Sequence, residues 1–327
     1  MYDVICVGSA TVDVFAKTEF SETLRDRKKT QCIAYPIGSK ILINDLLVSA
    51  GGGGTNTAVA LARLGHKVAF LGKTGVNENH HRVILEMEKD NVDTSLIVSN
   101  PKARTGYSLI LDSIKHDRTI LTFRGSNNDL RYNEINFKKL KAKWFIFTSL
   151  QGESFRTQER LAAYAKRKGI KIAFILSEYL AKKGAGGLRK ILSNTEIIVM
   201  NREEAEIFLN NKGTILENLK KLNALGPKIA IITDGSRGPH VLSQGAYYHS
   251  KPRNVKVVET TGAGDAFAAS FLSGMIKKGE IEFAIKLGIV NAESVIRYHG
   301  AKNILLSYRE ALKHMKRSGI RLIKEDA

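Results

Sequence analysis

Cysteine is scarce in this chain, whose 327 residues include only two, Cys6 and Cys32. Two thiols are too few for a disulfide framework or a cysteine-based zinc site, and Cys6 falls within a predicted buried strand. This usage indicates a reducing compartment, and we expect the cytoplasm. The 8 histidines show no His-x-x-x-His spacing, so no helical zinc motif is predicted.

Long apolar runs are also missing from the sequence. No stretch approaches the roughly 20 residues that a membrane-spanning helix requires, so no membrane contact is expected. Residues 1–8 have the pattern of a first β-strand rather than of a basic, cleavable leader. The Gly-x-Ser-x-Gly elbow and the Gly-Lys-Ser/Thr loop do not occur either, which argues against those hydrolase and nucleotide-binding classes.

Positive charge is in excess, with 51 Lys and Arg against 32 Asp and Glu and a net charge of +19. Such a field attracts anions, so both nucleic acid and a phosphorylated small molecule are candidate partners. The basic residues are scattered over polar faces of predicted helices and over loops. No zinc-finger, basic-zipper or aromatic-rich RNA-binding signature occurs. We therefore favour a solvated basic surface and expect no specific nucleic-acid partner.

From about residue 143 onward, short β-rich apolar runs alternate with helical segments. The predicted strands are 144–148, 171–176, 197–200 and 228–233, and the predicted helices are 154–168, 187–192, 203–209 and 215–225. After a meander at 241–248, helices are predicted over 263–277, 281–298 and 308–317. This alternation predicts an α/β fold with a parallel sheet between helices.

The N-terminal third lacks this alternation. Strands are predicted over 12–17, 31–35, 40–43 and 46–48, and a further pair over 105–111 and 118–123 is joined by a turn around 113–117. We interpret them as a small β lid, formed by about 13–50 and 104–125, within one domain spanning 1–327. A lid would exclude water from a transferable phosphoryl group, and its edge strands offer a surface for a homodimer.

Residues 259–265, Glu-Thr-Thr-Gly-Ala-Gly-Asp, are the most informative segment because they lead directly into a predicted helix. Two glycines allow a tight turn, and amides at a helix N-terminus point donors at an anion. Asp265 then falls in the first helical turn, where it can take a proton from a hydroxyl that attacks a phosphate. The same segment also fits an ordinary glycine-rich helix cap.

A second glycine-rich segment contains four consecutive glycines at 51–54, then Asn56, and leads into a predicted helix over 59–64. Its amides and the Asn56 side chain suit a polyol hydroxyl, although a flexible turn would look the same. Asp13 lies just past the first strand, where open α/β sheets bind their ligands. Its carboxylate can accept two hydroxyl hydrogen bonds, or it can be a surface residue.

Two later strand ends carry polar groups. Asn201 and Glu204 follow the strand at 197–200, and their spacing fits a helix capping box. It also suits Mg²⁺ held through water beside nucleotide phosphates. Thr233, Gly235 and Gly238 end the next strand and suit either a nucleotide's phosphates and ribose or a plain turn.

Taken in this order, the motifs resemble the ribokinase-like (PfkB) family of carbohydrate and nucleoside kinases over nearly the whole chain. The family's two signatures are matched by 51–65 and 260–265, and its Asn-x-x-Glu and Thr-x-Gly motifs by the two strand ends. The resemblance implies a three-layer α/β/α core with a mainly parallel sheet and a small β lid. It further implies transfer of the γ-phosphoryl of Mg-ATP to a hydroxymethyl group of a sugar or nucleoside.

The resemblance also implies residue roles. Asp265 would be the general base, and an anion hole would be formed by the amides of Gly262, Ala263 and Gly264. The acceptor would be held by Asp13, Gly52, Gly53 and Asn56. Mg²⁺ would be organised, through water, by Asn201 and Glu204. The nucleotide would be bound by Thr233, Gly235 and Gly238, with Asn291 near the adenine.

Three positions depart from the family pattern. Glu259 stands where the second signature usually opens with Asp, and that position helps to build a monovalent-cation site, so the departure argues against potassium activation. Gly53 replaces a lysine common in ribokinases proper, so ribose is not assured as the acceptor. Asn77 stands where many relatives have Asp, which removes a charge near the acceptor.

The acceptor itself stays open at this stage. A sugar is favoured, and the alternatives are a nucleoside such as adenosine, guanosine or cytidine, or a sugar acid or phosphosugar. Arg104 and Arg124 could bind an anionic group, and Tyr107 and Phe123 could cover a nucleobase. Solvent contacts and lid packing would explain the same residues. A non-catalytic relative that binds nucleic acid is the remote alternative.

Overall fold

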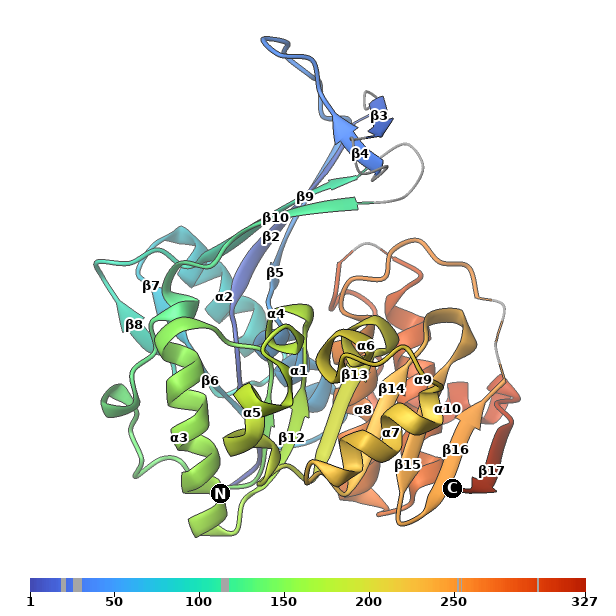
Figure 1. The fold of residues 1–327 in the computed structure, drawn as a ribbon. Coiled ribbons are helices and arrows are strands. Elements are labelled where there is room, and N and C mark those ends of the chain that lie inside the picture. The colour runs from blue at the N-terminus through green and yellow to red at the C-terminus, as the bar shows by residue number, and fades with distance from the viewer. Residues whose placement is uncertain (19–21, 26–30, 113–117, 252, 254, 299) are drawn as a thin grey trace.

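A nine-stranded sheet forms the centre of the computed structural model, which describes residues 1–18, 22–25, 31–112, 118–251, 253, 255–298 and 300–327 (Figure 1). The strand order is β17-β16-β15-β14-β13-β12-β11-β1-β6. Within this sheet, the six strands β14, β13, β12, β11, β1 and β6 are parallel to one another. The pairings that add β15, β16 and β17 are antiparallel. Their bounds are β1 (Tyr2–Val7), β6 (Val68–Leu71), β11 (Ala142–Phe147), β12 (Lys171–Ile175), β13 (Ile197–Asn201), β14 (Ile229–Thr233), β15 (Pro239–Ser243), β16 (Ala246–Ser250) and β17 (Leu322–Asp326).

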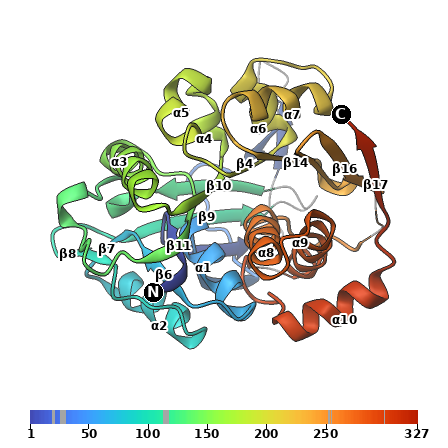
Figure 2. The same cartoon turned by 90° about the horizontal axis from the view of Figure 1, so that it is seen from below.

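Helices cover both faces of this sheet, as Figure 2 shows from below. One face carries α3 (Gly152–Lys168), α4 (Glu178–Ala181), α5 (Gly184–Leu192), α6 (Arg202–Leu209) and α7 (Ile215–Ala224). The other carries α1 (Gly53–Arg63), α2 (Glu78–Lys89), α8 (Ala263–Lys277) and α9 (Ile281–Val295), with α10 (Tyr308–Ser318) packed outside α9. The predicted three-layer α/β architecture is confirmed. Among the described residues, no helix is long and apolar enough to cross a membrane.

Because helices cover both faces of the sheet, the sequences of the core strands are unbroken apolar runs. In β1, Ile5 and Val7 pack into the cluster beneath α3 to α7, while Val4 and Cys6 pack into the cluster beneath α1, α8 and α9. All four side chains are fully buried. A strand covered on both sides has no solvent face, so its sequence shows no polar alternation.

A smaller sheet rises from the carboxyl ends of the core strands (Figure 1). Its order is β10-β9-β2-β5, with β2 (Thr11–Lys17), β5 (Asp45–Gly51), β9 (Gly106–Asp112) and β10 (Arg118–Phe123). β2 pairs parallel to β9, and the other two pairings are antiparallel. Beyond it lies the antiparallel pair of β3 (Glu22–Arg25) and β4 (Gln31–Ala34). Because β2 follows β1 directly and β5 leads into α1, the base of this sheet adjoins the strand ends.

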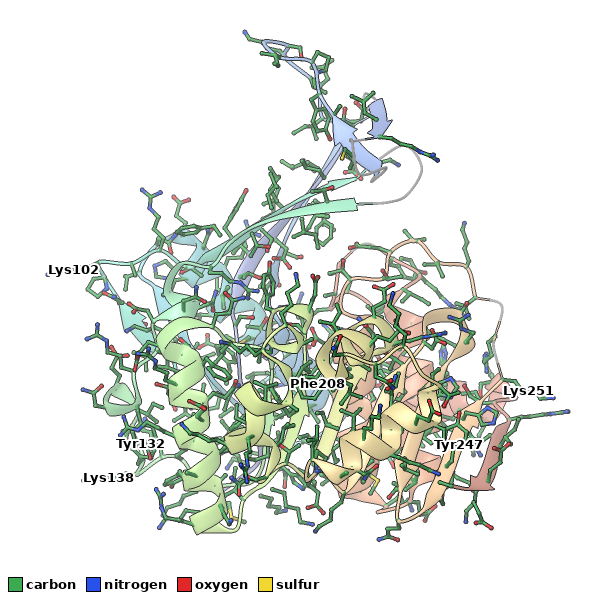
Figure 3. All side chains as sticks on the ribbon, in the orientation of Figure 1. Lys102, Tyr132, Lys138, Phe208, Tyr247 and Lys251 are labelled. Atoms are coloured by element: carbon green, nitrogen blue, oxygen red, sulfur yellow. The ribbon has the colours of Figure 1, made fainter. Side chains whose placement is uncertain are left out.

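Several short elements complete the described chain. β7 (Lys73–Gly75) and β8 (Val98–Asn100) form a parallel pair, and three 3₁₀ turns occur at η1 (Gly125–Asn128), η2 (Tyr132–Glu134) and η3 (Gly235–Arg237). Figure 3 shows Lys102, Lys138 and Lys251 extending outward from different parts of the surface, whereas Phe208 is buried. This arrangement agrees with a basic charge that is scattered rather than gathered on one arm.

The structure corrects parts of the sequence-based assignment. The strand predicted over 40–43 is wrong, because these residues form no regular element and Leu42 and Ile43 are 83% and 54% exposed. The second glycine segment is not a turn before the helix, since α1 already begins at Gly53. Helix α2 was absent from the prediction. The turn predicted around 113–117 lies outside the described residues.

Candidate functional site

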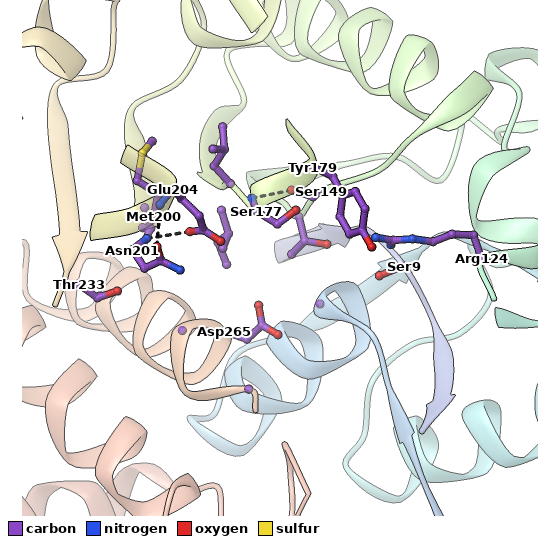
Figure 4. Close-up of a pocket in the computed structure, with 17 residues that line it drawn as sticks. Ser9, Arg124, Ser149, Ser177, Tyr179, Met200, Asn201, Glu204, Thr233 and Asp265 are labelled. Atoms are coloured by element: carbon purple, nitrogen blue, oxygen red, sulfur yellow. Dashed lines mark hydrogen bonds between the residues drawn. The ribbon is translucent and has the colours of Figure 1, made fainter. Parts of the chain in front are cut away.

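Two adjoining cavities, each of about 330 Å³, open at the carboxyl ends of the core strands. We call the first the central cavity; Figure 4 shows it, with Asp265 between Asn201 and Thr233 on one side and Arg124 on the other. The second, the side cavity, lies between α8, α9 and the segment after β16. Thr233 and Gly264 line both, so the two cavities meet at the N-terminus of α8. Open α/β sheets bind ligands at this edge.

The glycines before Asp265 serve two different purposes. Gly262 caps α8 with φ at +82°, and a Cβ there would lie 2.4 Å from the Cβ of Ala301. Glycine is therefore required for the turn itself. A Cβ on Gly264 would meet nothing within 4 Å, so the space over this first turn is open to a ligand. The N–H of Ala263 donates to the carbonyl of Thr260, which occupies one of the three predicted anion-hole amides.

Asp265 lies in the first turn of α8 and is held by Asn56 from α1. The Nδ2 of Asn56 donates a 2.9 Å hydrogen bond to Oδ2 of Asp265. The Oδ1 of Asn56 is buried without a hydrogen-bond partner among the described residues. Burial raises the pKa of Asp265 to about 6, while the Asn56 bond and the Lys302 ammonium oppose that rise. A base with this pKa is largely ionised at neutral pH and close to its working range.

Asp13 lies behind the glycine segment and is not part of the lining of the central cavity. Its side chain is 7% exposed, and its Oδ1 accepts a 2.8 Å hydrogen bond from the hydroxyl of Thr11. The carboxylate packs on Gly51, where a Cβ would lie 1.8 Å from Asp13 Oδ2. Burial raises the pKa of Asp13, and its charge in turn raises the pKa of Asp265. The two carboxylates are therefore electrostatically coupled.

A buried cation, Lys302, stands near these carboxylates and was not anticipated from the sequence. Its side chain extends from the loop before α10 to within 3.3 Å of Thr55 Oγ1 and 3.9 Å of Glu86 Oε2. Burial lowers the pKa of Lys302 to about 8, against the opposing charges of Glu86 and Asp13. Nothing in the local sequence distinguishes this lysine from the many exposed ones.

Asn201 and Glu204 form the capping box that their spacing suggested. Glu204 N donates to Asn201 Oδ1 and Asn201 N donates to Glu204 Oε2, both at 2.8 Å. Both residues also line the central cavity. Burial raises the pKa of Glu204 to about 7, with further rises from the charges of Asp265 and Glu178. Because both residues cap α6 and line the central cavity, the capping role and a role at the cavity are compatible.

The side cavity contains the predicted nucleotide residues of β14 and η3. Thr233, Gly235 and Gly238 line it, together with Phe267, Ile289 and Ile296 from α8 and α9. A Cβ on Gly235 would meet nothing within 4 Å, so this wall is open. A largely apolar pocket that reaches a helix N-terminus suits a flat ring with an anionic tail.

Some predicted residues are not brought to either cavity. Asn291 is fully buried in α9, where Nδ2 donates to Ser270 Oγ and Oδ1 accepts from Leu306 N. Arg104 is exposed, and Tyr107 on β9 lies in register with Phe123 on β10. Gly52 packs against the carbonyl of Ser9 rather than lining the cavity, whereas Gly53 lines it.

Glu259 joins the segment before α8 to the loop that carries Lys302. The side chain is 7% exposed, and its Oε2 accepts a 3.2 Å hydrogen bond from Gly300 N. In the described part of the chain, no group of three or more His, Cys, Asp or Glu side chains is arranged to hold a metal ion. A divalent cation at Glu204 would therefore draw its remaining ligands from a bound phosphate and water.

Comparison with known proteins gives consistent matches over the length of the chain. The sequence profile described as pfkB family carbohydrate kinase matches residues 1–307. An uncharacterized sugar kinase of Archaeoglobus fulgidus is 31% identical over 250 residues, covering 75% of this chain and 97% of that protein. The 5-dehydro-2-deoxygluconokinase of Halalkalibacterium halodurans is 26% identical over 324 residues, covering 94% of this chain and 93% of that protein.

A solved structure supports the same fold. Arabidopsis thaliana ribokinase in complex with ribose and ATP superposes with a TM-score of 0.77. The identity is 20%, and the match covers 96% of this chain and 99% of that chain. At this identity the likeness concerns the fold alone.

Proposed function

Because this chain belongs to the pfkB family of carbohydrate kinases, and is therefore a phosphotransferase with an alcohol acceptor, we propose that it phosphorylates a hydroxymethyl group of a sugar with Mg-ATP. One observation carries the proposal. Asp265 stands beside the open first turn of α8, where the central and side cavities meet. A proton acceptor and an anion-binding helix end thus share the point at which the two substrates would touch.

On the acceptor side, Asp265 takes the proton of the attacking hydroxyl, because its pKa of about 6 leaves it ionised at neutral pH. Asn56 orients it through the Nδ2 hydrogen bond, and the Oδ1 of Asn56, which has no hydrogen-bond partner among the described residues, would accept from a second hydroxyl of the acceptor. Asp13, behind Gly51, adds a buried charge that keeps the pKa of Asp265 raised. Gly53 lines the central cavity where the acceptor would approach α1, and Gly52 packs the backbone before α1 closely against Ser9.

On the nucleotide side, the residues fit ATP. The side cavity has apolar walls for a purine, and it reaches Gly264 at the N-terminus of α8, where backbone amides of a first helical turn suit phosphate oxygens. Thr233, Gly235 and Gly238 line the path between them. Bound Mg-ATP supplies the transferable phosphoryl group and neutralises the charge that develops on it. Glu204 and Asn201 would hold the metal ion through water, and its charge would favour the ionised form of Glu204.

Potassium is not expected to be required, because Glu259 replaces the Asp that helps to build a monovalent-cation site in relatives, and its Oε2 already accepts a hydrogen bond from Gly300 N. The test is simple. Turnover measured with potassium and with a bulky organic cation of equal ionic strength should agree within about two-fold.

The small sheet is proposed to act as a lid over the central cavity and as a dimer surface. Its edge strand β10 exposes Ile120, Leu121 and Phe123 by 44%, 54% and 53%, and Leu46 on β5 is 56% exposed. A run of exposed apolar side chains on an edge strand favours association with a second copy. Light scattering should show a dimer, and Leu121→Asp should give a monomer; a wild-type monomer at micromolar concentration would contradict this proposal.

The function is tested by ADP release with Mg-ATP across neutral sugars, sugar acids, sugar phosphates and nucleosides. A sugar is the expected acceptor, and the relative named 5-dehydro-2-deoxygluconokinase makes a sugar acid the second candidate, since the cavity also contains Arg124. Nucleosides complete the panel. Silence with every acceptor, while ATP still binds, would contradict the proposed function.

A further inference from the structure

Arg124 brings a positive charge to the central cavity that phosphoryl transfer to a neutral sugar does not need. It is the one lysine or arginine among the described residues that line this cavity. The side chain reaches in from the N-cap position of η1, directly after the edge strand β10. Asp265 and Glu204 supply carboxyl groups to the same cavity, so the cavity has acidic side chains as well as the basic side chain of Arg124.

The Arg124 guanidinium is held in position by an aromatic ring, and its hydrogen-bond donors remain available to a ligand. It lies over the ring of Tyr179, with 4.7 Å between the Arg124 Cζ and the ring centroid. A cation–π contact of this kind holds the guanidinium over the ring and leaves N–H groups that do not face the ring available. Within the described part of the chain, no carboxylate forms an ion pair with Arg124. A planar, stacked arginine with an open edge is a site for a carboxylate or a phosphate, which it can bind through two parallel hydrogen bonds.

The backbone beneath Arg124 is fixed to the core. Asn127 exchanges two 2.8 Å hydrogen bonds with Ala10, in the turn between β1 and β2, and its Nδ2 also donates to the carbonyl of Arg124 at 3.0 Å. Asn127 is 2% exposed. The arginine therefore extends from a rigid base, which reduces the entropy lost when it binds an anion.

Figure 4 shows Arg124 and Asp265 on different sides of the central cavity, with Asn201 and Thr233 beyond Asp265. If the nucleotide phosphates lie towards Thr233 and Gly264, the acceptor extends from Asp265 towards Arg124. Its hydroxyl end then meets the base, and its far end meets the guanidinium.

We propose that the acceptor carries an anionic group, a carboxylate or a phosphate, at the end remote from the reacting hydroxyl, and that Arg124 stacked on Tyr179 binds this group. This inference rests on the proposed kinase function and names its acceptor class. Tyr179 acts as a positioning residue, since its ring holds the guanidinium at the cavity.

The test compares acceptors that differ only in the anionic group. Gluconate is paired with sorbitol, and fructose 6-phosphate with fructose, so the two arms distinguish a carboxylate from a phosphate. Dissociation constants are measured by calorimetry in the Asp265→Asn background, where binding is read without chemistry, and KM is measured in the otherwise wild-type enzyme. The variants are Arg124→Gln, Arg124→Lys and Tyr179→Ala. Arg160→Gln is the matched control, because Arg160 also stacks on a tyrosine, Tyr132 at 3.9 Å, but lines neither cavity.

We expect one anionic acceptor to bind at least about ten-fold more tightly than its neutral partner. Arg124→Gln should weaken the anionic acceptor by roughly 10- to 100-fold and leave the neutral one unchanged. Arg124→Lys should restore part of the difference, Tyr179→Ala should show an intermediate loss, and Arg160→Gln should match wild type.

The inference would be overturned if sorbitol and fructose each bound as tightly as, or more tightly than, their anionic counterparts. An equal loss of affinity for anionic and neutral acceptors in Arg124→Gln would also overturn it. Phosphorylation of a neutral sugar with a KM that Arg124→Gln does not change would leave the kinase function standing and remove only this inference. Arg124-dependent binding of an anionic acceptor without any turnover would support the anion site and contradict the proposed kinase function.

Discussion

Asn56 Nδ2 donates a 2.9 Å hydrogen bond to Asp265 Oδ2 and so joins two motifs that lie 209 residues apart. The bond fixes the carboxylate of α8 against the first turns of α1. It also leaves Asn56 Oδ1 as a buried acceptor without a partner among the described residues. A buried acceptor in that state costs free energy unless a ligand satisfies it, and this cost supports the proposal that Asn56 both orients Asp265 and accepts from a hydroxyl of the substrate.

Replacing Asp265 by Asn tests the base directly. The amide keeps the shape and can still accept from Asn56, but it cannot take a proton. We expect kcat to fall by about 10²- to 10⁴-fold, with the affinity for ATP unchanged. Because burial disfavours the charged form of Asp265, the variant should melt at or above the wild-type temperature. ADP release, calorimetry and thermal unfolding provide the three readouts, and near-normal kcat would exclude Asp265 as the base.

The pH profile should follow the ionisation of Asp265. Its pKa of about 6 is raised chiefly by burial, and only the ionised carboxylate accepts a proton. The expected kcat/KM is therefore constant above pH 7 and falls about ten-fold per unit below pH 6. Glu204, whose pKa is about 7, is the rival cause of such a fall. Raising Mg²⁺ would shift a fall caused by Glu204 to lower pH, because the metal competes with the proton, but would not move one caused by Asp265.

The sequence predicted the local backbone of two of these motifs, because such motifs act locally. A glycine pair before a helix, or Asn and Glu spaced for a capping box, dictates the backbone around itself, and each appears where expected at Gly262 and Asn201. The direction in which a given side chain points from a long buried helix is harder to predict from the sequence. Asn291 turns to Ser270 and Leu306 rather than to the side cavity, because α9 is buried on nearly all sides and polar residues in it have no marked face.

Other features depend on packing that no local pattern encodes. Lys302 is buried by α1 and α2, although lysines in general are exposed. Arg104 and Arg124 stand at the same end of the antiparallel β9 and β10 pair, yet only Arg124 lines the cavity. Helix α2 buries only Val83 and Met87, so its apolar stripe is too narrow to be separated from a loop by periodicity.

Lys302 is expected to tune Asp265 through space. Its ammonium opposes the rise in the pKa of Asp265, so Lys302→Met should raise that pKa further. The acidic fall in kcat/KM would then move to higher pH, while the plateau above it persists. A merely structural role would lower activity at all pH values without moving the midpoint. Lys277→Met is the control, since Lys277 stacks on Tyr308 at 4.4 Å and lines neither cavity.

Substitutions at Gly262 and Gly264 should distinguish an effect on folding from an effect on nucleotide binding. Gly262→Ala should destabilise the protein by at least about 1–2 kcal/mol, because φ is +82° there and the new methyl would lie against Ala301. Gly264→Ala places a methyl in open space within a helix, so stability to urea should be unchanged or higher by up to about 1 kcal/mol. That methyl nevertheless fills the space proposed for the phosphates, and KM for ATP should rise by at least about ten-fold. An unchanged KM in stable Gly264→Ala would place the triphosphate away from α8.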